Sequence, residues 1–259
     1  MRRWAWFGPA FVVAFVASIV VGGALATGDT LYLPDASVAD LRAFYGHNLP
    51  AVVAQSALQV LAAVALYLFG RGLHRSLWPN RPDGLDRPDR LGRVAAWGNA
   101  AAAGFLLLSV LTSVSLAAVA ERADAGVVSA LGTATLLCGG AVHLAGLAVF
   151  VTASSVAGLR RRTRGRWVFR YGRWAGPLVA VSVVSIVWPP LLRLEPLWRL
   201  VAIVWIVGVT VAARRSGGVA SPGRLGRPGG LSRLIHPEPS QPARPVLAAG
   251  VSCRRGTGW

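Results

Sequence analysis

Three polar side chains that could bind a ligand stand inside long apolar stretches of the sequence: Gln55, Gln59 and His143. The two glutamines are four residues apart, which places them on one face of a helix. In an apolar setting, an amide or an imidazole must bond either to a neighbouring helix or to a polar ligand. These three residues form the candidate polar cluster. We expect Gln59 and His143 to face the protein interior at similar depth, with Gln55 one turn away.

The same residues also have a purely structural interpretation. Glutamines spaced four apart often join helices through hydrogen bonds, each worth about 0.6 to 2 kcal/mol in a membrane. His143 lies close to Gly139, Gly140 and Gly146, a setting typical of a hydrogen-bonded histidine between closely packed helices. A cavity that contains Gln59 and His143 would favour ligand binding, whereas tight packing would favour a structural role.

The apolar stretches lack the residues that most intramembrane chemistry needs. They contain no Asp, Glu or Lys, and only Arg199 lies within them, near an end. Ion-coupled carriers, intramembrane aspartyl proteases and zinc proteases place carboxylates or an HExxH pattern at membrane depth. The two cysteines, Cys138 and Cys253, lack metal-site spacing and are too few for a disulfide framework. We therefore expect no catalytic residue, cofactor or metal, and a protein that is not an enzyme.

Composition places these residues in a membrane protein. Hydrophobic residues make up 54% of the 259 residues and charged residues only 14%, whereas about a quarter of a soluble domain is charged. Apolar runs of about 20 residues can cross the hydrocarbon core as helices, which satisfy their own backbone hydrogen bonds. The sequence predicts an all-α polytopic helical bundle at 1–213, with six spans at about 6–26, 49–69, 94–119, 130–157, 174–192 and 197–213.

Charge distribution predicts the orientation of the bundle. All 27 basic residues are arginines, and 23 of them fall on the side of the N-terminus if the chain crosses six times. Because positively charged loops stay inside the cell, both termini are expected to be cytoplasmic, in a bacterial cell membrane. The arginine-rich stretch 160–173 is predicted to be a loop that contacts anionic lipid headgroups, with Trp167, Tyr171 and Trp174 as interfacial anchors. This interpretation is favoured over nucleic-acid binding.

Three further segments carry predictions. In the outer connection, Ser37 and Asp40 have capping-box spacing and Gly46 could be the residue just past the helix C-terminus. Val38, Leu41 and Tyr45 then share one face of a short helix. Such a helix is either a lid over a cavity or a passive surface helix.

The tail at 214–259 is rich in Gly, Pro and Arg and is predicted to be disordered and basic. The first apolar run could be a cleaved signal peptide, although a stripe of small residues at 10, 14, 18, 22 and 26 favours a retained packing helix.

The order of these parts resembles a known family. The segments PDASVADLRAFYGHN, RGRWVFRYGRWAG and PLWRLVAIVWIVGVTVAARR, with the spacing of the spans over about 8–215, together resemble the uncharacterised multi-pass integral membrane proteins common in actinobacteria. The resemblance implies a six-helix bundle without assigned activity, and it implies no site residue. The arginine-rich 71–93 loop and the long basic tail depart from that family.

The sequence thus predicts a non-enzymatic membrane component, for instance an accessory subunit with a membrane-protein partner. The alternative is an uncoupled carrier or small-molecule-binding membrane protein with a cavity between the second and fourth spans.

Overall fold

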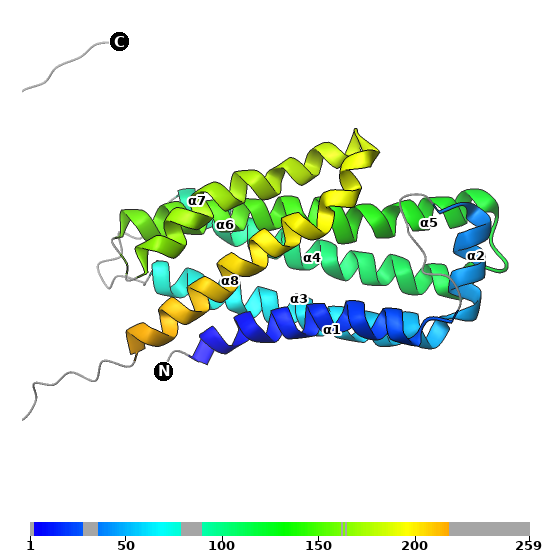
Figure 1. Ribbon diagram of the computed structural model, residues 1–259, viewed down its shortest axis with the longest axis horizontal. Helices are drawn as coiled ribbons and strands as arrows, with labels where there is room; N and C mark the ends of the chain where they lie inside the picture. The colour runs from blue at the N-terminus through cyan, green and yellow to red at the C-terminus, as the bar shows by residue number, and fades with distance from the viewer. Residues whose placement is uncertain (1–2, 28–35, 79–89, 162, 164, 218–259) are drawn as a thin grey trace, which may run out of the picture. The chain divides into compact units, whose positions relative to one another are not determined.

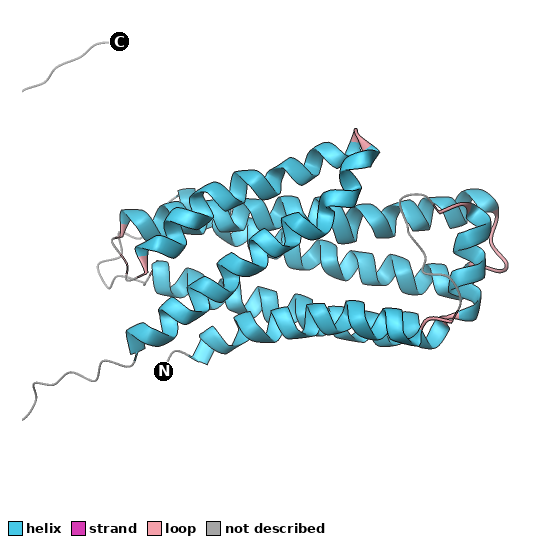
Figure 2. Ribbon diagram, in the orientation of Figure 1, coloured by secondary structure: helices cyan, strands magenta, loops and turns pink. Residues whose placement is uncertain are grey.

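A computed structural model describes residues 3–27, 36–78, 90–161, 163 and 165–217 of the chain. Over these residues every regular element is helical and no strand occurs (Figure 2), which confirms the predicted all-α class. The elements, drawn in Figure 1, are η1 Arg3–Trp6, α1 Phe7–Leu25, α2 Val38–His47, α3 Leu49–Leu77, α4 Arg90–Val119, α5 Ala125–Leu137, η3 Cys138–Val142, α6 His143–Arg160, α7 Arg166–Ala180, η4 Val181–Ile186, η5 Pro189–Leu194 and α8 Glu195–Gly217.

Five described helical segments are long and apolar enough to cross a membrane. They are Arg3–Leu25, Leu49–Leu77, Arg90–Val119, Ala125–Arg160 and Pro190–Arg215. This finding supports a multi-pass membrane type of protein. The remaining predicted span, 174–192, is not one regular helix, because it comprises the second half of α7 followed by the 3-10 segments η4 and η5. Pro177 lies inside α7 and Pro189 begins η5, and proline removes a backbone donor that a regular helix needs.

The long helices pack around a shared core. Helix α3 packs against α1 and α4, α6 packs against α4 and α7, and α8 contacts α7, α6 and α1. Large rings fill the part of the core where α3, α6 and α8 meet. Phe150 makes edge-to-face contacts with Phe69 and Trp205, at centroid distances of 6.4 and 5.6 Å. Trp205 is fully buried, so this tryptophan of α8 packs against α6 through Phe150.

Helix α2 lies crosswise at the end of the bundle opposite to η1 (Figure 1). Its capping box is complete, because Ser37 accepts a bond from the Asp40 amide and the Asp40 side chain accepts one from the Ser37 amide. Leu41 and Tyr45 are buried in a small apolar cluster with residues of α3, α4 and α5. The prediction that Gly46 lies just past the C-terminus of the helix is wrong, since α2 continues through Gly46 to His47.

The stretch predicted as an arginine-rich loop is helical from Arg166 onward, as the start of α7. The helix forms because its polar and apolar residues segregate, with Val168 and Phe169 buried and Trp167 and Trp174 exposed. Tyr171 is half-buried, and its hydroxyl donates to the Val201 carbonyl of α8 at 3.1 Å. Tyr171 therefore joins two helices.

Other boundaries differ from the sequence prediction by a turn or more. Helix α3 continues to Leu77 and α4 begins at Arg90, so the predicted 71–93 loop is shorter than expected. Helix α8 continues to Gly217, into the predicted tail. Residues 79–89 and 218–259, on which the loop and tail predictions fall, lie outside the described residues.

Candidate functional site

A cavity of about 450 Å³ lies between α1, α3, α4, α5 and the start of α8, next to α2. One part of its wall is apolar and includes Phe15, Ile19, Val52 and Leu106. The other part is polar, with Gln55, Gln59, Ser109, Ser113, Thr135, Arg193, Glu195 and Arg199. A volume of this order can hold a small molecule.

Gln55 and Gln59 both line this cavity from α3. The Gln55 side chain lies against α1 where Gly22 leaves room, since a Cβ there would be 2.5 Å from the Gln55 Oε1 atom. Neither amide has a hydrogen-bond partner among the described residues. Both amides are therefore able to form hydrogen bonds with a molecule in the cavity.

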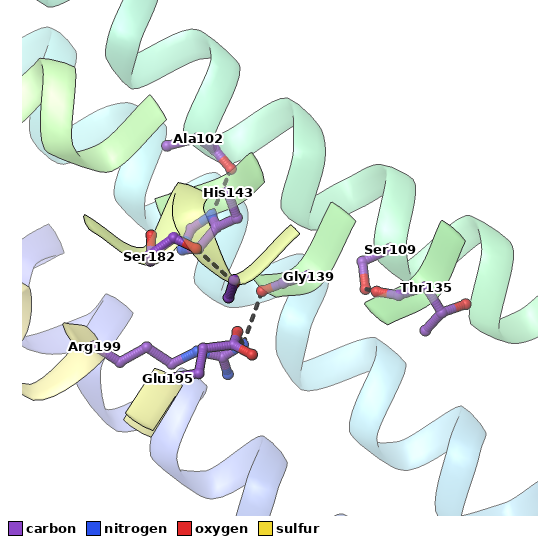
Figure 3. Close-up of polar contacts among 9 residues, drawn as sticks. Ala102, Ser109, Thr135, Gly139, His143, Ser182, Glu195 and Arg199 are labelled. Atoms are coloured by element: carbon purple, nitrogen blue, oxygen red, sulfur yellow. Dashed lines mark hydrogen bonds and ion pairs between the residues drawn. The ribbon is translucent and has the colours of Figure 1, made fainter. Parts of the chain in front are cut away.

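His143, the third member of the candidate cluster, does not line the cavity. Its ring is buried, and Nδ1 lies 2.7 Å from the carbonyl oxygen of Ala102 on α4. Because a carbonyl can only accept, Nδ1 carries the proton. Figure 3 shows this bond beside Ser182 of η4. The structure thus brings Gln55 and Gln59 together and gives His143 a separate role as a bond between α4 and α6.

An ion pair that was not predicted from the sequence lies in the polar wall. Glu195 Oε1 and an Arg199 guanidinium nitrogen are 2.5 Å apart, on the first turn of α8. The same Arg199 nitrogen donates to the Gly139 carbonyl at 2.9 Å (Figure 3). The guanidinium also lies over the Phe15 ring, 5.3 Å from its centroid, in a cation–π contact.

The Gly139 carbonyl lies where the helix from Ala125 to Arg160 is interrupted. Residues Cys138–Val142 form a π-helical turn, in which Gly140 has a non-helical backbone (φ −100°, ψ −110°). Such turns release backbone groups from the regular ladder and occur often at functional sites. Gly140 also makes room, because a Cβ at this position would lie 2.6 Å from Glu195 Oε1.

The structure corrects the placement of Arg199 near the end of a span. Arg199 contacts Phe15 near the middle of α1 and Gly139 near the middle of the α5–α6 helix. The side chains are only 25% (Arg199) and 13% (Glu195) exposed. Placing the last span at 197–213 put Glu195 outside it. The sequence does contain one sign of the ion pair: Glu195 and Arg199 are four residues apart, a spacing that places opposite charges on one face of a helix.

Helix α2 contributes Phe44 and Tyr45 to the cavity wall. The Tyr45 hydroxyl lies 3.5 Å from Ser113 Oγ on α4, and burial raises the pKa of Tyr45 above its usual value. Arg42 ties the helix down by donating to the Ala123 carbonyl at 2.7 Å. This placement corresponds to the lid interpretation of α2, because the helix borders the cavity.

The arrangement supports binding more readily than bond-making chemistry. The cavity offers unpaired amides, hydroxyl groups, an ion pair and an apolar wall, which together match a ligand with a polar head and an apolar body. Ser109 and Thr135 are partly committed to the protein, since Ser109 Oγ donates to the Thr135 carbonyl at 3.1 Å and Thr135 Oγ1 to Thr112 Oγ1 at 2.9 Å. Gln55 and Gln59 therefore remain the most available groups.

Comparisons with known proteins add no relative: no protein-family model, no curated protein and no solved structure matches this chain.

Proposed function

We propose that this chain is a multi-pass protein of the bacterial cytoplasmic membrane that binds a small molecule in the cavity between α1, α3, α4, α5 and α8. The observation that carries the proposal is the cavity itself, which contains two amides without protein partners, Gln55 and Gln59. A bundle with a purely structural role would have packed this space, because protein interiors are close-packed. This choice takes the binding alternative over the accessory-subunit prediction.

The charges of the cavity wall indicate the class of ligand. Two arginines, Arg193 and Arg199, line the cavity, whereas Glu195 is its one carboxylate among the described residues. Guanidinium groups recognise carboxylates and similar anions through paired hydrogen bonds. Phe15, Ile19 and Val52 offer an apolar surface for the rest of the molecule. The ligand we propose is a small monoanion, such as a carboxylate, with an apolar body.

The proposed protein works without ion coupling. Coupled carriers use intramembrane carboxylates that gain and lose a proton or a sodium ion. In the cavity described here the carboxylate of Glu195 is engaged by Arg199 at 2.5 Å. An uncoupled carrier or a membrane-embedded binding protein is therefore the form of activity that we propose.

The proposed membrane arrangement keeps six crossings with both termini cytoplasmic. Helix α7 and the 3-10 segment η4 together cover Arg166–Ile186, which corresponds to a rise of about 34 Å. This length matches the hydrocarbon core of about 30 Å. In Figure 1 the start of α7 and the end of α8 lie at the same end of the bundle as η1.

Calorimetric titration of the whole protein in lipid nanodiscs tests the binding proposal. The probes are hexanoate and octanoate, with hexylamine and octylamine as ligands of the same shape and opposite charge. We expect saturable binding of a carboxylate and at least about tenfold weaker binding of the amines, because a like charge beside Arg193 and Arg199 is unfavourable.

Two variants and a control complete that test. Arg199→Met and Gln59→Leu should each weaken carboxylate binding about tenfold or more, since each loses a hydrogen-bonding group worth about 1.5 kcal/mol or more to an anion. Ser154→Ala should leave it unchanged, because Ser154 is buried in α6 outside the cavity. Equal binding by all variants, or no saturable binding of either carboxylate, would rule the proposal out.

A further inference from the structure

A second hollow of about 470 Å³ lies between α3 and α4, near the ends of these helices that join residues 79–89. Residues at helical spacing line it from both sides: Tyr67, Arg71 and His74 on α3, and Arg93, Ala96 and Trp97 on α4. It shares no lining residue with the ligand cavity. It is therefore a separate candidate site.

Close packing of the two helices forms the floor of this hollow. The Asn99 side chain of α4 fits against Gly70 of α3, where any Cβ would collide with it. Its amide nitrogen donates to the Tyr67 carbonyl at 3.1 Å. The Asn99 Oδ1 atom is buried and has no partner among the described residues. The helices are thus held in a fixed register, which sets the positions of the arginines above this floor.

The charge of the hollow is entirely positive over the described residues. Arg71 and Arg93 are both exposed and have no hydrogen-bond or ion-pair partner in the described part of the chain. No carboxylate lines the hollow with them. The His74 ring is stacked on Trp78 with a centroid distance of 4.8 Å, which fixes its orientation. Two guanidinium groups beside an imidazole form a site suited to a phosphate.

The surroundings of the hollow are those of a membrane interface. Trp97 is 76% exposed and Tyr67 is 43% exposed on either side of it, and such residues gather at the level of lipid headgroups. Deeper along α4, Ala96 and Ala100 leave a shallow apolar surface. Basic pockets between membrane helices on the cytoplasmic side bind anionic headgroups.

We propose that Arg71, His74 and Arg93 form a binding site for the phosphate headgroup of an anionic phospholipid. The guanidinium groups contact the phosphate, Trp97 and Tyr67 flank the headgroup, and an acyl chain follows the Ala96–Ala100 surface. Phosphate could also come from a soluble source. The aromatic flanks and the apolar continuation favour a lipid.

Native mass spectrometry of the whole protein tests this proposal. The protein is released from nanodiscs that contain phosphatidylcholine with either cardiolipin or phosphatidylglycerol, and retained lipids are counted. The variant Arg71→Gln/Arg93→Gln should retain anionic lipid roughly 25-fold less strongly, because each arginine near the surface contributes about a factor of five. Phosphatidylcholine retention should not change.

The matched control is Arg75→Gln/Arg90→Gln, which removes the same charge from the same two helices at exposed positions outside the hollow. It should retain anionic lipid within about twofold of the unaltered protein. Equal losses in both double variants would overturn the proposal, since they would show a diffuse charge effect. Displacement of the lipid by inorganic phosphate at about 1 mM would overturn the lipid assignment in favour of a soluble phosphate.

Discussion

At the residue scale, the Glu195–Arg199 pair of α8 is held by contacts to two other helical segments. Arg199 bonds to Glu195 on α8 and to the Gly139 carbonyl, and it covers the Phe15 ring on α1. Removing one member of a buried pair is costly because the remaining charge has lost its partner. The pair therefore fixes the start of α8 against the interrupted helix, and it should respond to substitution as a unit.

A double-mutant cycle tests this coupling. Arg199→Met and Glu195→Gln should each lower the free energy of unfolding by about 1 to 3 kcal/mol, below the value for full burial because a quarter of the Arg199 side chain is exposed. The double variant should lose clearly less than both single losses together. Unfolding in mixed micelles with a denaturing detergent provides the measurement. Strict additivity would mean that the two charges do not depend on each other.

The same approach separates Gln59 from His143. The Gln59 amide lines the cavity, whereas the His143 ring is bonded to the Ala102 carbonyl outside it. We expect the losses in Gln59→Leu and His143→Leu to add within about 0.5 kcal/mol, because residues without a shared network are usually additive. His143→Leu alone should be the more destabilising change, since it removes the buried hydrogen bond that joins α6 to the Ala102 carbonyl of α4. A coupling above 1 kcal/mol would place both residues in one network.

The residues of the candidate site were predictable to different degrees. Gln55 and Gln59 could be found from sequence because amides are rare in long apolar runs. Glu195 and Arg199 could not be placed, because hydropathy sets their helix to begin after Glu195. Their depth depends on how α7 and α8 connect, and prolines and 3-10 turns determine that connection.

At the element scale, the crossing of α4 and α6 depends on two glycines. A Cβ at Gly146 would lie 2.6 Å from the Ala102 amide nitrogen, and one at Gly98 would lie 2.7 Å from the Phe150 amide nitrogen. Small residues at such crossings let membrane helices approach closely. The His143–Ala102 hydrogen bond spans the same crossing. The close approach therefore explains why a histidine borders a glycine-rich stretch.

Gly146→Ala tests this crossing. The added methyl group meets backbone atoms that cannot rotate away, so we expect a loss of roughly 1 to 3 kcal/mol. Gly104→Ala on α4 is the control, because a Cβ there has no neighbour within 4 Å. It should be neutral or stabilising by up to about 1 kcal/mol, as alanine favours helix over glycine. Similar losses in both variants would show that helix propensity, and not packing, governs the effect.

Some helices could be predicted from the sequence and others could not, for physical reasons. Helix α2 was predicted well because its capping box is local, with Ser37 and Asp40 three residues apart. The start of α7 was predicted as a loop because its arginines suggested a solvated connection. Its buried face, with Val168 and Phe169, depends on contacts with α6 and α8, and such tertiary contacts are not visible in local composition.

At the scale of the whole molecule, several helix ends meet at one end of the bundle. Trp78 at the end of α3 lies under Arg161 at the end of α6, with 5.9 Å from the guanidinium carbon to the ring centroid. Arg214 of α8 lies 3.8 Å from the Trp6 ring centroid in η1. Because η1 also packs against α3, these contacts place η1, the end of α3, the end of α6 and the end of α8 together. Helix α2 lies at the opposite end (Figure 1).

The common position of these helix ends allows the orientation prediction to be stated for particular residues. The end that contains Arg161 and Arg214 also carries most of the arginines among the described residues, and positively charged connections stay in the cytoplasm. We therefore expect Ser76 and Thr163 to face the cytoplasm and Ser37 to face outward. The exposed capping position at Ser37 is accessible to a reagent.

Cysteine labelling of intact cells measures this orientation. Ser37→Cys, Ser76→Cys and Thr163→Cys are introduced singly after Cys138 and Cys253 have been replaced by alanine, because Cys138 is a free thiol. A membrane-impermeant maleimide should label only the Ser37→Cys protein, and all three should react once the membrane is opened. Opening the membrane controls for a buried thiol at position 76, because the Ser76 hydroxyl is bonded to the Leu73 carbonyl.

Labelling at Thr163 from outside, with none at Ser37, would require the reverse orientation. It would also move the proposed phospholipid site to the outer leaflet, since Arg71 and Arg93 lie toward the same end of the bundle.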